Sequence, residues 1–205
     1  MEKTLLIATT NRHKVEEICA IFADCGLRGW QFRTLADEAD YQPPEEDGDS
    51  FAANAAIKAA AAARYSGMIA LADDSGLTVE ALAGAPGIYS ARYAGPQQDD
   101  AANRTKLLAA LSGVPDEARD AAFVCAVAIA CPQADGSLRM LSCEGSCSGR
   151  ISRQEQGENG FGYDCLFYLP SFGMTIAELP PEEKNRISHR SAAMREAARL
   201  LQNLG

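Results

Sequence analysis

The chain alternates short apolar runs, each the length of a buried strand, with longer segments whose apolar residues recur at helical spacing. Strands are predicted at residues 4–8, 68–72, 121–131 and 163–169, with a strand or hairpin at 137–152. Helices are predicted at residues 15–25, 50–65, 99–111 and from residue 191 onward. Because the late strands follow one another without helices between them, they cannot all be parallel. The order therefore predicts an α/β fold with a mixed sheet.

The composition is that of an ordinary globular protein. Of the 205 residues, 47% are hydrophobic and 23% are charged, which fits a single domain spanning residues 1–205. The net charge of −9 repels polyanions, so a nucleic-acid partner is disfavoured. No apolar stretch reaches 18 residues and no signal-peptide pattern is visible at the start. We therefore expect no membrane association and a cytoplasmic location.

A polar turn follows the first predicted strand and leads into a helix. Its residues are Thr9, Thr10, Asn11, Arg12, His13 and Lys14. Helix N-terminal N–H groups at the carboxyl end of a strand commonly bind phosphate. The turn lacks both the P-loop and the G-x-G-x-x-G patterns, so a helix cap followed by a solvated lysine is the alternative interpretation.

Acidic residues gather in two further places. Asp73 and Asp74 directly follow the predicted strand at residues 68–72, where α/β proteins often place catalytic groups. Adjacent carboxylates supply the hard oxygen ligands that Mg²⁺ prefers, although the run from Asp73 to Gly76 is also typical of a tight turn. Glu46 lies in an acidic loop before a helix that carries Asn54 and Lys58 four residues apart. These last two residues indicate either part of a site or merely a solvated helix face.

The last cluster is basic, in a chain that is acidic overall. The segment Gly160-Phe161-Gly162-Tyr163-Asp164 is followed by Lys184 and then by Ser188-His189-Arg190. A loop and a solvated basic patch would explain these residues. A concentration of positive charge also suits a phosphorylated ligand.

Taken together, the clusters resemble the inosine triphosphate pyrophosphatase family, whose members hydrolyse non-standard purine nucleoside triphosphates. The resemblance covers nearly the whole chain in seven ordered matches. These are Ala8 to Lys14, Glu46 to Phe51, Asn54 to Ala59, Leu71 to Leu77, Gly84 to Tyr93, Gly160 to Asp164, and Ser188 to Arg190. Two positions depart from the family pattern: Ala53 stands where a glutamate is usual, and Cys165 where a proline is usual.

The resemblance implies a two-lobed α/β fold around a long mixed β-sheet flanked by helices, with the active cleft between the lobes. It also implies a homodimer, dependence on Mg²⁺, and cleavage of ITP, dITP or XTP to the monophosphate and pyrophosphate. The chain would then be a nucleoside-triphosphate pyrophosphatase, a hydrolase that cleanses the nucleotide pool.

The family's site residues map onto matching positions of this sequence. The resemblance assigns metal binding to Glu46 and Asp74, and catalysis to Asp74, Lys58 and Asp73. It assigns substrate binding to Thr9, Thr10, Asn11, Arg12, His13, Lys14, Asn54, Ser75, Phe161, Gly162, Tyr163, Asp164, Lys184, His189 and Arg190. Within that set, Phe161 would stack on the purine, and donors from the segment of His189 and Arg190 would meet its 6-oxo group.

Two other functions remain open at this point. One is a nucleotide-binding regulatory protein without significant turnover, although the presence of Lys14, Asp73 and Asp74 argues against it. The other is a pyrophosphatase that acts on modified pyrimidine nucleotides. Rates of turnover on a panel of triphosphates distinguish all three.

Overall fold

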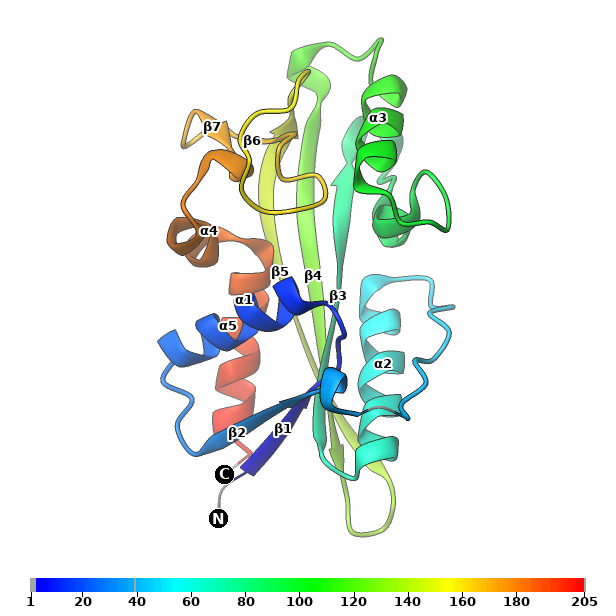
Figure 1. Ribbon diagram of the computed structural model, residues 1–205, viewed down its shortest axis with the longest axis vertical. Coiled ribbons are helices and arrows are strands. Elements are labelled where there is room, and N and C mark those ends of the chain that lie inside the picture. Colours follow the sequence, from blue (N-terminus) through cyan, green and yellow to red (C-terminus); the bar gives the residue numbers. More distant parts are fainter. Residues whose placement is uncertain (1–2, 39, 205) are drawn as a thin grey trace. The chain divides into compact units, whose positions relative to one another are not determined.

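The computed structural model describes residues 3–38 and 40–204 (Figure 1). In this part of the chain the strands are β1 (Lys3–Ile7), β2 (Trp30–Thr34), β3 (Ile69–Val79), β4 (Asp120–Pro132), β5 (Leu138–Ile151), β6 (Phe167–Leu169) and β7 (Met174–Thr175). The α-helices are α1 (Arg12–Asp24), α2 (Phe51–Ser66), α3 (Asp100–Ala110), α4 (Pro181–Ile187) and α5 (His189–Gln202).

The strands form one sheet in the order β2-β1-β3-β4-β5-β6-β7. β1 is parallel to β2 and to β3, whereas β6 is antiparallel to β5 and to β7. The predicted α/β fold with a mixed sheet and flanking helices is therefore confirmed. None of the helices in the described residues is both long and apolar enough to cross a membrane.

The chain divides into two compact units. Unit 1 comprises Met1–Asp74, Cys125–Gly145 and Arg190–Gly205, and unit 2 comprises Ser75–Val124 and Ser146–His189. The strands β3, β4 and β5 each contribute residues to both units.

In unit 1, the two faces of the sheet bury different side chains because successive residues of a strand point to opposite faces. Leu5 and Ile7 of β1 pair in register with Ile69 and Leu71 of β3, and these residues pack against α1 and α5. The alternate residues of the same strands pack against α2, on the opposite side of the sheet (Figure 1). Unit 1 thus has a helical layer on each face of its strands.

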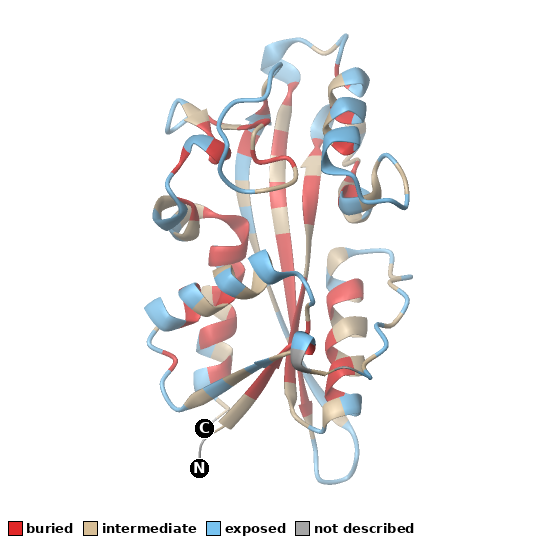
Figure 2. Cartoon of the chain, viewed as in Figure 1, coloured by how far each residue is buried: buried red, intermediate tan, exposed pale blue. Residues whose placement is uncertain are grey.

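The contact between α2 and the sheet consists mainly of alanines. Ala55, Ala59 and Ala62 of α2 are fully buried, and they belong to one cluster with Ala70 of β3 and Ala130 of β4 (Figure 2). Small side chains on both surfaces let the helix backbone approach the strands closely. The polar residues Asn54 and Lys58 of α2 therefore lie close to Asp74, the last residue of β3 that belongs to unit 1.

Both ends of α2 lie within one residue of the helix predicted at residues 50–65. Ser50 is the N-cap, and its hydroxyl accepts a hydrogen bond of 3.3 Å from the backbone N–H of Ala53. Gly67 ends the helix in the left-handed conformation, with a φ of 68°, and its N–H donates to the carbonyl of Ala63. Local sequence therefore fixes the position of this helix along the chain.

The core of unit 2 centres on aromatic residues. The rings of Phe123 on β4 and Phe167 on β6 lie 4.5 Å apart, and Leu107 and Leu111 anchor α3 to the same cluster. Gly149 of β5 is required here, because a Cβ at that position would lie 2.5 Å from the ring of Phe167. This core supports the segment that follows β5.

Three features of the sequence prediction are wrong. The strand predicted at residues 68–72 does not end there but continues to Val79 as β3, because Leu77 and Val79 are fully buried in unit 2 and continue the strand alternation. The predicted strand at 163–169 is reduced to β6, since the amides of Leu166 and Phe167 instead close turns onto the carbonyl of Tyr163. Strand β2 and helix α4 were not predicted, because they are short segments of five and seven residues.

We expect Ala59→Leu to destabilise the protein, because no space for three more carbon atoms exists between α2 and the sheet. Overpacking of this kind costs about 1–3 kcal/mol. The same substitution at Ala52, which is exposed on the same helix, serves as the matched control and should cost little. Urea denaturation measures both free energies of unfolding, and equal values for the two variants would contradict the close contact described above.

Candidate active site

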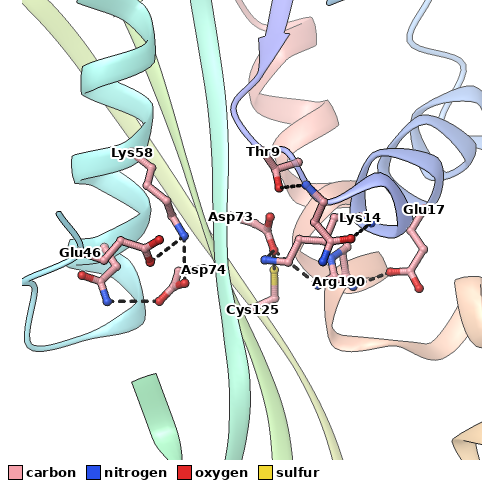
Figure 3. Close-up of polar contacts among 11 residues, drawn as sticks. Thr9, Lys14, Glu17, Glu46, Lys58, Asp73, Asp74, Cys125 and Arg190 are labelled. Carbon is pink, nitrogen blue, oxygen red and sulfur yellow. Dashed lines mark hydrogen bonds and ion pairs between the residues drawn. The ribbon is translucent and has the colours of Figure 1, made fainter. Parts of the chain in front are cut away.

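Asp73 and Asp74 lie on opposite faces of β3. Asp73 continues the face of Leu71, toward α1 and α5, whereas Asp74 continues the face of Ala72, toward α2 (Figure 3). The side chain of Asp73 is 1% exposed and that of Asp74 is 13% exposed. The two adjacent carboxylates therefore have different partners, and they do not form one acidic pair.

On the α2 side, Asp74 meets a lysine that also binds Glu46. The Nζ atom of Lys58 lies 3.0 Å from Asp74 Oδ1 and 3.0 Å from Glu46 Oε2. Asn54, one helical turn before Lys58, lies with its Nδ2 atom 3.4 Å from Asp74 Oδ2. The structure thus brings Glu46, Asn54, Lys58 and Asp74 together, and Asn54 and Lys58 do not lie on a solvated helix face.

Gly48 fixes the orientation of Asn54. Its backbone N–H donates a hydrogen bond of 2.9 Å to Asn54 Oδ1, which leaves the amide nitrogen directed at Asp74. A Cβ at position 48 would lie 2.6 Å from that same oxygen, so a glycine is required for the approach. The loop that carries Glu46 is thereby tied to the start of α2.

Burial and charge act against each other in this cluster. Burial raises the pKa of Asp74 above its ordinary value, although Lys58 lowers it in part. Burial alone would lower the pKa of Lys58, but Asp74, Asp73 and Glu46 together raise it, so the ammonium stays charged. Asp74 is thus a carboxylate that accepts a proton more readily than an exposed aspartate.

On the other face of β3, Asp73 is surrounded by cations. Its Oδ2 atom lies 3.0 Å from Lys14 Nζ and 3.5 Å from an Nη atom of Arg190, while Cys125 Sγ lies 3.9 Å away. Burial alone would raise the pKa of Asp73, but Lys14 and Arg190 hold it well below its usual range. Asp73 therefore stays ionised and cross-links α1 to the start of α5.

Glu17 completes this network, and the sequence analysis missed it. Its carboxylate accepts a hydrogen bond from the second Nη atom of Arg190. The signal was present in the sequence, because Glu17 stands three residues after Lys14 and so shares its side of α1. Arg190 is thus held by one carboxylate from α1 and one from β3.

The turn before α1 is closed by its own side chains. Asn11 is the N-cap of α1, and its side-chain oxygen accepts a hydrogen bond of 3.3 Å from the backbone N–H of Lys14. The hydroxyl of Thr9 accepts one of 3.2 Å from the backbone N–H of Asn11. Thr10, Arg12 and His13 are exposed, whereas the Lys14 ammonium is paired with Asp73 and is not simply solvated.

In unit 2, the segment from Phe161 to Asp164 forms a turn around one carboxylate. Asp164 Oδ2 accepts hydrogen bonds of 3.0 Å from the Phe161 N–H and 2.9 Å from Lys184 Nζ. The same ammonium lies 4.8 Å from the centre of the Phe161 ring. The structure therefore brings Phe161, Asp164 and Lys184 together, as expected for parts of one site.

The other predicted substrate-binding residues lie in different surroundings. Tyr163 is buried, and its hydroxyl donates to the carbonyl of Ser90 at 2.8 Å. His189 is buried in unit 2 with its ring stacked on Phe123 at 4.9 Å. Ser75 is half-buried on β3.

The model of the Ham1 family matches residues 5–200. The dITP/XTP pyrophosphatase of Desulforamulus reducens is 49% identical over 200 residues, which cover 98% of this chain and 96% of that protein. The dITP/XTP pyrophosphatase of Geobacillus kaustophilus is 49% identical over 192 residues, which cover 94% and 91%. The structure of a HAM1 protein from Coxiella burnetii matches with a TM-score of 0.87 and 40% identity, covering 98% of this chain and 99% of that one.

We expect Asp73→Asn to destabilise the protein by about 3–5 kcal/mol at neutral pH, because the charge of Arg190 would lose a buried partner. The folded-state pKa of Asp73 is lowered, so its contribution to stability is present above the unfolded-state pKa of about 3.9. It is lost as the pH falls through the lower folded-state pKa.

Urea denaturation of wild type and variant from pH 7 down to pH 3 would measure this difference, which should shrink below about pH 4. Asp120→Asn is the control, because that carboxylate is 45% exposed in a surface pair with Arg150 and should contribute less than about 1 kcal/mol. If Asp73→Asn were as stable as the control at pH 7, the cross-link would have no structural role.

Proposed function

The chain belongs to the Ham1 family, and from this membership we propose that it is a nucleoside-triphosphate pyrophosphatase, which hydrolyses ITP, dITP and XTP to the monophosphate and pyrophosphate. The names of relatives 49% identical over nearly the whole chain support these substrates. The structural observation that carries the proposal is one cluster beside β3, in which Lys58 contacts both Asp74 and Glu46 and Asn54 contacts Asp74.

The phosphates bind to the turn before α1. Lys14 supplies a charge whose position is already set by its contact with Asp73, so little side-chain entropy is lost on binding. The first N–H groups of α1 add neutral donors, and the dipole of the helix favours an anion at this end. Thr9, Thr10, Arg12 and His13 lie in the same turn and line the phosphate chain.

The residues around Asp74 fit a divalent cation. Two carboxylates already converge on one positive charge, the Lys58 ammonium, and Mg²⁺ usually takes one or two carboxylates together with substrate phosphates. Glu46 and Asp74 would hold Mg²⁺, which would neutralise phosphoryl charge and ease deprotonation of a water.

Asp74 accepts the proton of the attacking water. Asn54 and Lys58 hold the two carboxylate oxygens, so the group is oriented before the substrate arrives. Asp73 contributes from the other face of the strand by fixing Lys14 and Arg190.

Most of the residues proposed to recognise the purine belong to unit 2. Phe161 offers an aromatic surface for stacking, and Asp164 and Lys184 offer a paired acceptor and donor. Donors from this group and from His189 and Arg190 would match a 6-oxo purine. Adenine carries an amino group in place of the 6-oxo acceptor, so these donors would have no partner when ATP is bound. Unpaired donors of this kind can reduce activity on the wrong substrate by about 10⁴-fold.

We further propose that the enzyme requires Mg²⁺ and acts as a homodimer in the cytoplasm, on the strength of the family resemblance. The net charge of −9 supports a small nucleotide rather than a nucleic acid as its partner.

We expect pyrophosphate release from ITP, dITP and XTP, with much slower release from GTP and ATP, and loss of all activity when Mg²⁺ is chelated. The measurement is pyrophosphate and orthophosphate release from each nucleotide side by side, with a modified pyrimidine triphosphate included. Orthophosphate as the first product would indicate a different phosphatase. Faster turnover of the pyrimidine nucleotide, or tight binding of ITP without turnover, would contradict the proposal in favour of the other two functions.

We expect Asp74→Asn to lower kcat for ITP by about 10²–10⁴-fold, because the amide keeps the shape but cannot accept the proton. Asp120→Asn removes an exposed carboxylate elsewhere on the sheet and should leave kcat unchanged. Circular dichroism and a urea midpoint for both variants separate loss of catalysis from loss of folding. A rate near that of the wild type would remove Asp74 from the mechanism.

A further inference from the structure

Two residues of α3 hold both backbone polar groups of Gly162. The Gly162 N–H donates a hydrogen bond of 2.9 Å to Asp100 Oδ2, and Arg104 donates one of 3.1 Å from Nη1 to the Gly162 carbonyl. All three residues belong to unit 2. A glycine has no side chain to pack, so these backbone bonds are the means by which α3 holds this point of the turn.

The side chains of Asp100 and Arg104 are themselves held in place. Asp100 and Arg104 stand four residues apart, on one side of the first turns of α3. The Nε atom of Arg104 also lies 2.8 Å from Glu155 Oε1, so both ends of its guanidinium are engaged. Leu107, in the next turn, is fully buried and anchors α3 in the core of unit 2.

Glycines shape the segment that leads into the turn. Gly157, Gly160 and Gly162 all adopt positive φ values, of 83°, 83° and 61°, which are typical of a segment shaped by glycine. A cavity of about 310 Å³ borders the segment, lined chiefly by Asp100, Arg104, Glu155 and residues 157–162. If the bonds to α3 were lost, the turn would have space in which to move.

On its other side, the turn carries the ring proposed to stack on the purine. Phe161 precedes Gly162, and its N–H is bound to Asp164 Oδ2 at 3.0 Å. A Cβ at Gly160 would lie 2.2 Å from that same oxygen, so the chain folds tightly around the Asp164 carboxylate. Asp164 thus holds the turn from within, and α3 holds it from outside.

We infer that Asp100 and Arg104 are positioning residues for purine recognition, which act through the backbone of Gly162 to preset the ring of Phe161. The inference rests on the proposed function. A Phe161 ring that is already in place loses little conformational entropy on binding. The bonds to α3 should therefore lower KM for the preferred purine and raise its kcat/KM relative to that of other purines. They should have little influence on the chemistry at Asp74.

The first test is kinetic. Asp100→Ala and Arg104→Ala should each raise KM for ITP by about tenfold, the equivalent of one hydrogen bond, with kcat within about twofold. The ratio of kcat/KM for ITP to that for GTP should fall. Thr105→Ala, an exposed change on the same helix, is the control and should match the wild type. A fall in kcat with KM unchanged would overturn the inference.

Asp100→Asn distinguishes the hydrogen bond from the charge. Asparagine keeps an oxygen that can accept from the Gly162 N–H but loses the negative charge near the start of α3. The inference therefore requires Asp100→Asn to retain a KM near that of the wild type. If Asp100→Asn were as impaired as Asp100→Ala, Asp100 would act through the helix dipole, and the inference would be wrong.

The second test needs no substrate. Amide hydrogen exchange by NMR, without nucleotide, should be faster for Gly162 and Phe161 in Asp100→Ala and Arg104→Ala than in the wild type, Thr105→Ala or Asp100→Asn. Unchanged exchange in both alanine variants would overturn the inference even if KM rose. If the wild type failed to hydrolyse ITP, the proposed function would fail, whereas the exchange rates would still decide whether α3 holds the turn.

Discussion

The site depends on a simple property of a β-strand, the alternation of its side chains between two faces. Because Asp73 and Asp74 are adjacent on β3, one carboxylate is directed toward α1 and α5 and the other toward α2. The first is enclosed by cations and has a structural role, and the second remains partly accessible beside Lys58. The helices on both faces of unit 1 are thereby joined to the same two residues of one strand.

The two carboxylates also show how surroundings give the same side chain opposite properties. Asp73 is the more buried, yet its pKa is lowered, because Lys14 and Arg190 overcome the cost of burying its charge. Asp74 has Lys58 as its main cationic partner, and there burial prevails and its pKa is raised. A charge that stays fixed suits a cross-link, whereas a carboxylate that can take up a proton suits a base.

In unit 2, a glycine-rich turn is held mainly by hydrogen bonds. The Phe161 segment has few side chains to bury, so it is held by hydrogen bonds from Asp164 within and from α3 outside. The rings of Phe123 and Phe167 and the buried Leu107 of α3 belong to one core cluster of unit 2. The Phe161 segment is thus held partly by α3, an element about 60 residues away in the sequence.

The sequence by itself determined the elements with strong local signals. The caps at Ser50 and Gly67 fixed α2, and the four-residue spacing of Asn54 and Lys58 placed both on one face of it, because these signals act within one or two helical turns. The order of elements was enough to predict a mixed sheet, and the ordered motifs were enough to identify the family.

Only the tertiary structure decided the course of β3 through Asp73 and Asp74. The residues of that segment favour a turn locally, but the burial of Leu77 and Val79 and the pairing within the sheet outweigh that preference. The contacts of Glu17 with Arg190, and of Arg104 with Gly162, join residues 173 and 58 positions apart. No local pattern records such partners, because the distance between them is set by packing and not by the chain.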